Sequence, residues 1–182
     1  MKTSFTTLTP LTLAALVAFL AMTAFASTSS LRAAPLKVGD TAPAVTCVTD
    51  NGATVNLGDV YRKNKYTLVY FYPKADTPGC TAQGCSLRDA YDPLTKAGVS
   101  VIGVSLDTME AQHAFREKYH FQFPLVTDTD RKVKNAFGVP GEKYDSRQAY
   151  LIENGKVIYA DYKGSTTQQA NDILAVIATN TK

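Results

Sequence analysis

Two runs of apolar and β-branched residues without a charge lie in the middle of the chain, at 66–72 (YTLVYFY) and 99–105 (VSVIGVS). Uninterrupted apolar runs of this length are typical of strands that are buried on both faces of a sheet. Each run is followed by helix-start signals, first near Pro78 and then at Asp107, which has a glutamate three residues later as in a capping box. The pattern therefore predicts two strand–helix units, the second ending near Tyr119.

Two tight-turn signals predict two β-hairpins. Asn-Gly pairs favour the turns that join neighbouring antiparallel strands. The sequence carries such turns at Asp50-Asn51-Gly52 and at Asn154-Gly155. The strands expected beside them span residues 44–49 and 53–57 in the first hairpin, and residues 149–152 and 157–161 in the second.

The rest of the chain adds shorter elements. We expect a strand at 125–127, a short helix at 130–137, and a final amphipathic helix that ends near Ala178 with Thr166 or Thr167 as its N-cap. This order of elements predicts an α/β sandwich, with a mixed central sheet flanked by helices. It is the order of a thioredoxin-like fold with an N-terminal hairpin extension. Open α/β sheets of this kind carry their sites at the C-terminal ends of central strands.

The first 26 residues have the pattern of a secretory signal peptide. Lys2 gives a short basic start, residues 11–26 are apolar and uncharged, and Ala24-Phe25-Ala26 is a small-x-small cleavage pattern. The alternative is an uncleaved membrane anchor, but the apolar run is shorter than the roughly 20 residues of a spanning helix. We therefore expect cleavage after Ala26, export to the periplasm and no stable membrane association after processing. The mature chain would have a flexible lead-in at 27–35 and one domain at 36–182.

Composition narrows the class of protein further. The chain has 182 residues, of which 45% are hydrophobic, which suits one globular domain with a buried core. Its net charge of +3 comes from basic residues scattered among almost as many acids, so the charge pattern does not indicate a nucleic-acid partner. Three cysteines in an exported chain fit one pair, Cys80 with Cys85, plus Cys47 as a spare.

The segment Thr77-Pro78-Gly79-Cys80 has the signals of a helix start. Thr77 suits the N-cap and Pro78 the first helical position, where no backbone N–H is required. Cys80 would then lie in the first turn, where free N–H groups and the helix dipole stabilise a thiolate. Thr77 could turn its hydroxyl toward the sulfur. The alternative, an inert buried cysteine, does not account for the way the cap, the proline and the cysteine converge.

Cys85 lies five positions after Cys80 in the same expected helix. Helix geometry sets their Cα atoms about 8–9 Å apart, beyond the roughly 7 Å that a disulfide tolerates. The two thiols could therefore bond only if the first turns unwind, which Gly79 and Gly84 favour because glycine weakens a helix. The alternative is that Cys85 is a small core residue.

The segment from Tyr70 to Asp89 (YFYPKADTPGCTAQGCSLRD) resembles the active site of a peroxiredoxin of the Q type, also called the bacterioferritin comigratory protein branch. The Pro-x-x-x-Thr-x-x-Cys signature of the family matches Pro73, Thr77 and Cys80. The similarity extends from about residue 38 to residue 177, through KVGDTAPAVT, FREKYHFQFPLVTD and ENGKVIYADY.

This resemblance implies a thiol peroxidase that needs no metal or other cofactor. Cys80 would be the peroxidatic cysteine and Cys85 the resolving one, with Pro73 and Thr77 positioning the peroxide. The active-site arginine of the family, near the start of a late strand, matches Arg147. The neighbouring Gln148 stands where a Ser or Thr is more usual, and the segment GEKYDS before it could shift the register. The expected partners are peroxides and a thioredoxin-like reductant, and the branch implies a monomer.

Other candidate residues have weaker support in the sequence. His113 is expected to be exposed on a helix, and His120 lies in a helix-to-strand loop. Cys47 fits a core or edge position in the first hairpin. Asp76 and Arg88 flank the expected site and could tune its field, but neither is expected to be catalytic.

Two other functions fit parts of the pattern. A thioredoxin-type thiol–disulfide oxidoreductase uses Cys-x-x-Cys, whereas four residues separate Cys80 from Cys85 here. A copper-delivery module on the same fold needs a histidine after the late hairpin, and none follows His120. Peroxide consumption measured beside a copper titration would separate the three classes.

Overall fold

A computed structural model describes residues 34–180. The predicted signal peptide and most of the predicted lead-in lie outside the described residues. The strands are β1 (Thr46–Thr49), β2 (Thr54–Asn56), β3 (Tyr66–Phe71), β4 (Val99–Ser105), β5 (Leu125–Thr127), β6 (Gln148–Glu153) and β7 (Lys156–Asp161). The helices are α2 (Leu57–Lys63), α3 (Pro78–Asp89), α4 (Tyr91–Lys96), α5 (Met109–Tyr119), α6 (Lys132–Ala136) and α7 (Gln169–Asn180).

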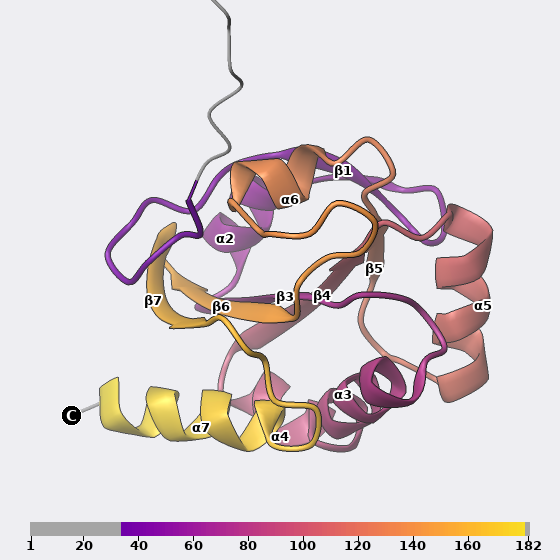
Figure 1. The fold of residues 1–182 in the computed structure, drawn as a ribbon. Helices are drawn as coiled ribbons and strands as arrows, with labels where there is room; N and C mark the ends of the chain where they lie inside the picture. The colour runs from indigo at the N-terminus through magenta and orange to yellow at the C-terminus, as the bar shows by residue number, and fades with distance from the viewer. Residues whose placement is uncertain (1–33, 181–182) are drawn as a thin grey trace, which may run out of the picture. The chain divides into compact units, whose positions relative to one another are not determined.

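The strands form one sheet in the order β2-β1-β5-β4-β3-β6-β7 (Figure 1). Strands β3, β4 and β5 are parallel, with Leu68 opposite Val101 and Gly103 opposite Leu125. The β6–β7 hairpin joins β3 antiparallel, and the β1–β2 hairpin joins β5 antiparallel. The predicted mixed sheet, both hairpins and the N-terminal extension are thus confirmed.

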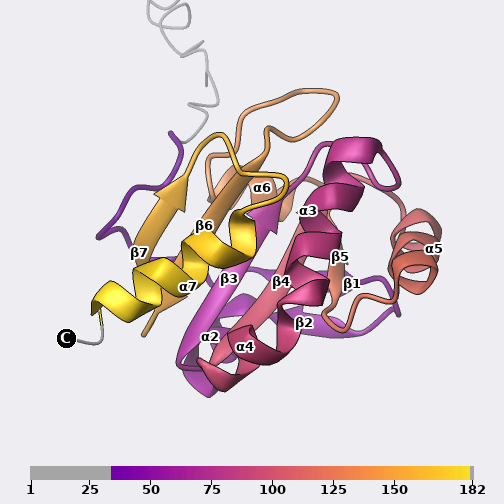
Figure 2. The same ribbon diagram turned by 90° about the horizontal axis from the view of Figure 1, so that it is seen from below.

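Helices cover both faces of the sheet, so the apolar runs in β3 and β4 are buried on both sides as predicted. Helices α3, α4 and α7 lie on one face (Figures 1 and 2). On this face Leu68 and Val101 pack with Leu87 and Ile173. Helices α2 and α6 lie on the opposite face (Figure 1), where the other side chains of β3 and β4 form a second apolar cluster. Helix α5 packs along β5.

Two predicted helix caps are wrong. Helix α5 is capped by Thr108, whose hydroxyl accepts from the N–H of Ala111 at 3.3 Å. Asp107 precedes this cap, and its carboxylate accepts instead from the N–H of Ala75 at 2.7 Å. Helix α7 begins at Gln169, so neither Thr166 nor Thr167 occupies the position directly before its first residue.

The other predicted elements have boundaries within a few residues of those observed, whereas helices α2 and α4 were not predicted. The short helix α6 begins at Lys132, two residues later than predicted, because Asp128 accepts hydrogen bonds from the N–H groups of Val133 and Lys134. Within residues 34–180, no helix combines the length and the apolar character that a membrane span requires.

Candidate active site

Cys80 lies where the sequence predicted it, in the first turn of the helix that follows β3. Thr77 is the N-cap residue with an extended backbone, and Pro78 is the first residue of α3. Cys80 is the third residue of the helix, and it is 2% exposed. A helix N-terminus presents free N–H groups and partial positive charge, which favour a thiolate at this position.

The hydroxyl of Thr77 differs from its expected role. It donates to the carbonyl oxygen of Lys74 at 2.9 Å and makes no hydrogen bond to the helix start. Its proton is therefore engaged away from Cys80, and the expected turn of the hydroxyl toward the sulfur is absent in this state. The oxygen keeps lone pairs that can accept a hydrogen bond from another group. Pro73 lies four residues before Thr77, half-buried in the loop between β3 and α3.

Arg147 lies immediately before β6, the strand that pairs with β3, and its side chain reaches Cys80. Its Nη2 donates to the sulfur of Cys80 at 3.4 Å, and its Nη1 donates to Oε1 of Gln83 at 2.5 Å. A fixed positive charge beside a sulfur favours the thiolate. The segment at 141–146 therefore does not move Arg147 away from the cysteine. Gln148, at the unusual position, is buried and accepts from the hydroxyl of Tyr150 at 2.5 Å.

Glycines on two segments leave room for the arginine side chain. A Cβ at Gly164 would lie 2.7 Å from Cγ of Arg147, and a Cβ at Gly79 would lie 3.2 Å from Nη2. The guanidinium thus passes between the start of α3 and the loop after β7 with little clearance.

Two glutamines complete the site, and sequence reasoning missed both. Gln83 is fully buried, and its Nε2 donates to Oε1 of Gln169 at 2.9 Å, which ties α3 to the first residue of α7. Gln83 stands one helical turn after Cys80, so its spacing could have placed it on the same face. No comparable signal identifies Gln169, because it is 86 positions further along the chain.

Tyr70 on β3 lies beneath the site. Its hydroxyl is buried and has no hydrogen-bond partner among the described residues. Burial is the main cause that raises its pKa, and the nearby Cys80 raises it further while Arg147 lowers it. Tyr70 is therefore a neutral phenol close to the sulfur and the guanidinium.

Cys85 is a free, half-buried thiol on the same unbroken helix as Cys80. Burial raises the pKa of its thiol, and the charge of Arg88 opposes this shift. Just before Cys85, a Cβ at Gly84 would lie 2.5 Å from the ring of Phe121, so the helix rests directly on this ring. Because the helix is continuous, the two sulfurs belong to different faces in this state.

The loop before Cys80 is anchored by two aspartates. Asp76, with a left-handed φ of 56°, accepts from Nζ of Lys118 at 2.7 Å and from the hydroxyl of Tyr119 at 2.7 Å. Asp107 holds Ala75 through the hydrogen bond described above. Asp76 thus binds α5, because Lys118 and Tyr119 both belong to that helix. Arg88 binds α5 as well, since it donates to the carbonyl oxygen of Tyr119 at 2.9 Å.

The histidines lie on α5 and at its end, apart from this constellation. His113 is exposed on α5, 3.7 Å from the carboxylate of Asp50, and His120 is exposed at the left-handed C-cap of the helix. Among residues 34–180, no group of three or more His, Cys, Asp or Glu side chains is placed to hold a metal ion.

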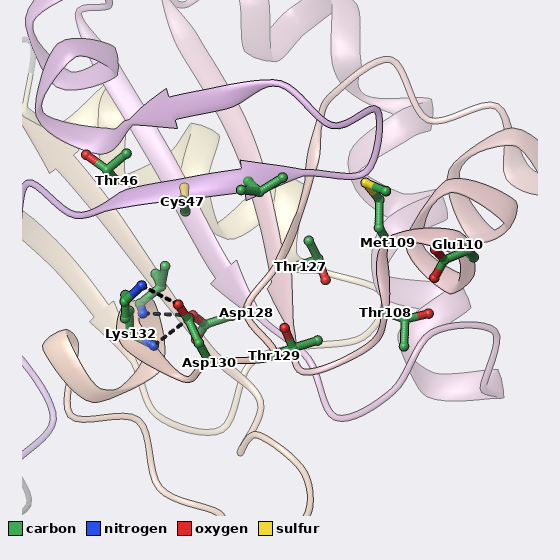
Figure 3. A pocket seen from close by; sticks show the side chains of 12 residues that line it. Thr46, Cys47, Thr108, Met109, Glu110, Thr127, Asp128, Thr129, Asp130 and Lys132 are labelled. Carbon is green, nitrogen blue, oxygen red and sulfur yellow. Dashed lines mark hydrogen bonds and ion pairs between the residues drawn. The ribbon is translucent and has the colours of Figure 1, made fainter.

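A separate cavity of about 420 Å³ lies between β1, β5 and the starts of α5 and α6 (Figure 3). Cys47 lines it, together with Met109 and a pair of aspartates, Asp128 and Asp130. The thiol of Cys47 donates to the carbonyl oxygen of Val55 at 3.5 Å, and burial raises its pKa to about 11. Cys47 is thus a core residue, as the sequence indicated, and Cys80 does not line this cavity.

Comparison with known proteins gives consistent similarities. The model of the AhpC/TSA family matches residues 38–160. Peroxiredoxin Bcp of Escherichia coli is 46% identical over 142 residues, covering 72% of this chain and 90% of the relative. Among solved structures, peroxidoxin BcpB of Mycobacterium tuberculosis has a TM-score of 0.75 at 28% identity, covering 79% of this chain and 97% of its own. The bacterioferritin comigratory protein of Xanthomonas campestris, described for its alkyl peroxide reduction activity, has a TM-score of 0.72 at 28% identity, covering 82% and 100%.

Proposed function

The chain belongs to the AhpC/TSA family and is a thiol peroxidase of the Bcp and peroxiredoxin Q type, and on this premise we propose that Cys80 is its peroxidatic cysteine. The substrates are hydrogen peroxide and organic hydroperoxides, the second class in keeping with the activity named for the Xanthomonas relative. The observation that carries the proposal is the contact between Arg147 Nη2 and Cys80 Sγ at 3.4 Å, at the N-terminus of α3.

The thiolate of Cys80 attacks one oxygen of the peroxide. A sulfur–oxygen bond forms as the oxygen–oxygen bond breaks, and the sulfur supplies the two electrons that reduce the peroxide. The departing oxygen leaves with a proton as water or alcohol, and Cys80 becomes a sulfenic acid. The guanidinium of Arg147, the N–H groups at the helix start and the oxygen of Thr77 hold the peroxide and stabilise the charge that develops as the bond breaks. Pro73 shapes the loop around this position.

Cys85 then resolves the sulfenic acid. Its thiolate attacks the sulfur of Cys80, a disulfide forms, and the hydroxyl leaves with a proton as water. This step requires α3 to unwind between the two cysteines, because the continuous helix holds them too far apart. A thioredoxin-like dithiol reduces the disulfide and returns the protein to its first state.

The cellular setting is a further part of the proposal. The pattern of residues 1–26 supports export to the periplasm, where the mature protein would begin at Ser27 and act as a monomer. Sequencing the N-terminus of the protein from a periplasmic fraction tests this point. A full-length chain retained in membranes would contradict it.

The activity is tested by following peroxide consumption with a thioredoxin system as the electron donor. We expect the wild-type protein to turn over and Cys80→Ser to be inactive with an unchanged circular dichroism spectrum, because a hydroxyl of similar size cannot supply the electrons. Peroxidase activity near the wild-type level in Cys80→Ser would place the reacting sulfur elsewhere.

A further inference from the structure

A buried ion pair lies close to the chain segment that leads into Arg147. Lys134 on α6 and Asp145 in the loop before β6 have side chains that are 1% and 0% exposed, and Nζ of Lys134 lies 2.9 Å from Oδ1 of Asp145. Apart from this ion pair, neither oxygen of Asp145 has a hydrogen-bond partner among residues 34–180. Removing two charges from water is costly, and such a pair often stabilises a core no better than apolar side chains would. Stability of the core is therefore a poor explanation for this pair.

The ammonium of Lys134 closes a short loop at both ends. Besides Asp145, it binds the carbonyl oxygen of Gly141, to which Nζ donates at 2.5 Å. The N–H of Ser146 donates to the carbonyl oxygen of Pro140 at 2.8 Å and completes the closure. Gly141 has a φ of +114°, and a Cβ there would lie 1.8 Å from a carbonyl oxygen of the same loop. The loop is thus tightly folded around one buried positive charge.

The main chain of Lys134 is fixed as well. Asp128 accepts from the N–H of Lys134 through Oδ2 at 2.8 Å and from the N–H of Val133 through Oδ1 at 2.9 Å. Val133 is itself fully buried in the core cluster beneath α6. The ammonium therefore projects from a rigid base, and the loop takes its position from that base.

Arg147 follows Asp145 by two residues, so the closed loop sets where its main chain begins. The side chain cannot correct an error in that starting point, because Gly164 and Gly79 confine it along its length. Catalytic groups are sensitive to such errors, since a misplacement of about 1 Å can cost about 100-fold in rate.

We propose that the Lys134–Asp145 ion pair sets the position of Arg147 over Cys80, which makes Lys134 and Asp145 positioning residues of the peroxide step. The proposal rests on the proposed role of Arg147 in that step. The ion pair would affect the rate of the peroxide step through the position of the Arg147 guanidinium. Such an effect differs from a general contribution to folding.

The test is a double-mutant cycle on the peroxide step. The reduced proteins are mixed with hydrogen peroxide by stopped flow, and the second-order rate constants are compared for wild type, Asp145→Asn, Arg147→Ala and the double variant. We expect Asp145→Asn to lower the rate about 10- to 100-fold when Arg147 is present and less than about twofold in the Arg147→Ala background. An equal loss in both backgrounds, or no loss in either, would overturn the proposal.

A second variant covers the case in which Asp145→Asn does not fold, since a lone buried charge is strongly destabilising. Lys134→Met/Asp145→Leu removes both charges, and we expect it to fold and yet to react about 10-fold more slowly, or worse, because Gly141 and Asp145 are no longer tied together. A wild-type rate in this folded variant would overturn the proposal.

A matched control lies on the same helix. Lys132 forms an ion pair with Asp130 at 2.5 Å, and both side chains are exposed. We expect Lys132→Met to react at the wild-type rate, and a loss equal to that of the buried-pair variants would overturn the proposal. A wild-type protein whose Cys80 does not react with peroxide would refute the proposed function and this proposal together, whereas fast reaction in every variant except Arg147→Ala would refute this proposal alone.

Discussion

Nη2 of Arg147 and Sγ of Cys80 lie 3.4 Å apart, although the two residues are 67 positions apart in the chain. The contact joins the entry of β6 to the first turn of α3, and these elements flank the same end of β3. It places a permanent positive charge beside a sulfur that a helix N-terminus also stabilises.

Replacing Arg147 by alanine should slow the reaction of reduced protein with peroxide about 10- to 1000-fold. The loss of one preorganised charged donor costs about 2–4 kcal/mol in a transition state. Stopped-flow measurement of the second-order rate constant checks this, with Arg88→Ala as the control because Arg88 binds the carbonyl oxygen of Tyr119 instead of Cys80. A rate unchanged in Arg147→Ala and reduced in Arg88→Ala would move the working guanidinium to Arg88.

Replacing Cys85 by serine should separate the first oxidation from turnover. Cys80 keeps Arg147 and its helix start in this variant, so it should still consume about one equivalent of peroxide. The reaction should then stop at the sulfenic acid and proceed to the sulfinic acid when peroxide is in excess. Mass spectrometry of the intact protein follows both products. Sustained turnover with a thioredoxin donor would show that Cys85 is not required for resolution.

Oxidation of the wild-type protein should loosen the start of α3. The disulfide requires the helix to unwind, so amide hydrogens from Cys80 to Leu87 should exchange faster with solvent in the oxidised protein than in the reduced one. Hydrogen-exchange mass spectrometry on the two forms measures this, and α2 serves as an internal reference because it lies on the opposite face of the sheet. Equal protection in both forms, with the Cys80–Cys85 bond present, would contradict the unwinding.

Cys47 should be nearly silent in turnover and slow to react with alkylating reagents. Its pKa of about 11 leaves about one thiolate in a thousand at pH 8. In a Cys80→Ser/Cys85→Ser variant, the rate of alkylation by iodoacetamide should rise about tenfold per pH unit from pH 7 to pH 10. A plateau near pH 9 would show an ordinary, exposed thiol.

The same shift has a consequence for stability. The pKa of Cys47 in the folded protein lies above the ordinary value of 9.0, so the thiol ionises in unfolded chains first. The contribution of Cys47 to stability is therefore fully present below pH 9 and is lost as the pH rises from about 9 to about 11. Cys47→Ala should remove this part of the alkaline decline in unfolding experiments with urea.

Local signals were sufficient for the elements that carry Cys80. The apolar run of β3 and the Thr-Pro pair at the helix start predict their own structures, because strand burial and helix capping depend on neighbouring residues. The cap of α5 shows where such rules fail. Asp107 and Thr108 both suit an N-cap, and the choice between them is decided by the N–H of Ala75, which lies 32 positions away and takes the carboxylate of Asp107.

The bonds between the parts of the site could not be predicted in the same way. Gln83, Arg147 and Gln169 come from three segments, and each amide or guanidinium alone resembles an ordinary polar surface residue. Resemblance to a family indicated Arg147, but nothing in the sequence indicates that Gln83 would be buried between it and α7. The role of such side chains depends on the contacts that they make once the sheet brings their segments together.

Gln83 stands between Cys80 and Cys85, inside the segment that disulfide formation would open. Unwinding of this segment would break the hydrogen bond that Gln83 accepts from Arg147. The oxidised protein cannot reduce further peroxide, because the sulfur of Cys80 is held in the disulfide and has no thiolate to react. The oxidised fraction of the protein would accordingly reflect past exposure to peroxide. The lifetime of the oxidised form would be set by the supply of reductant and not by the peroxide that remains.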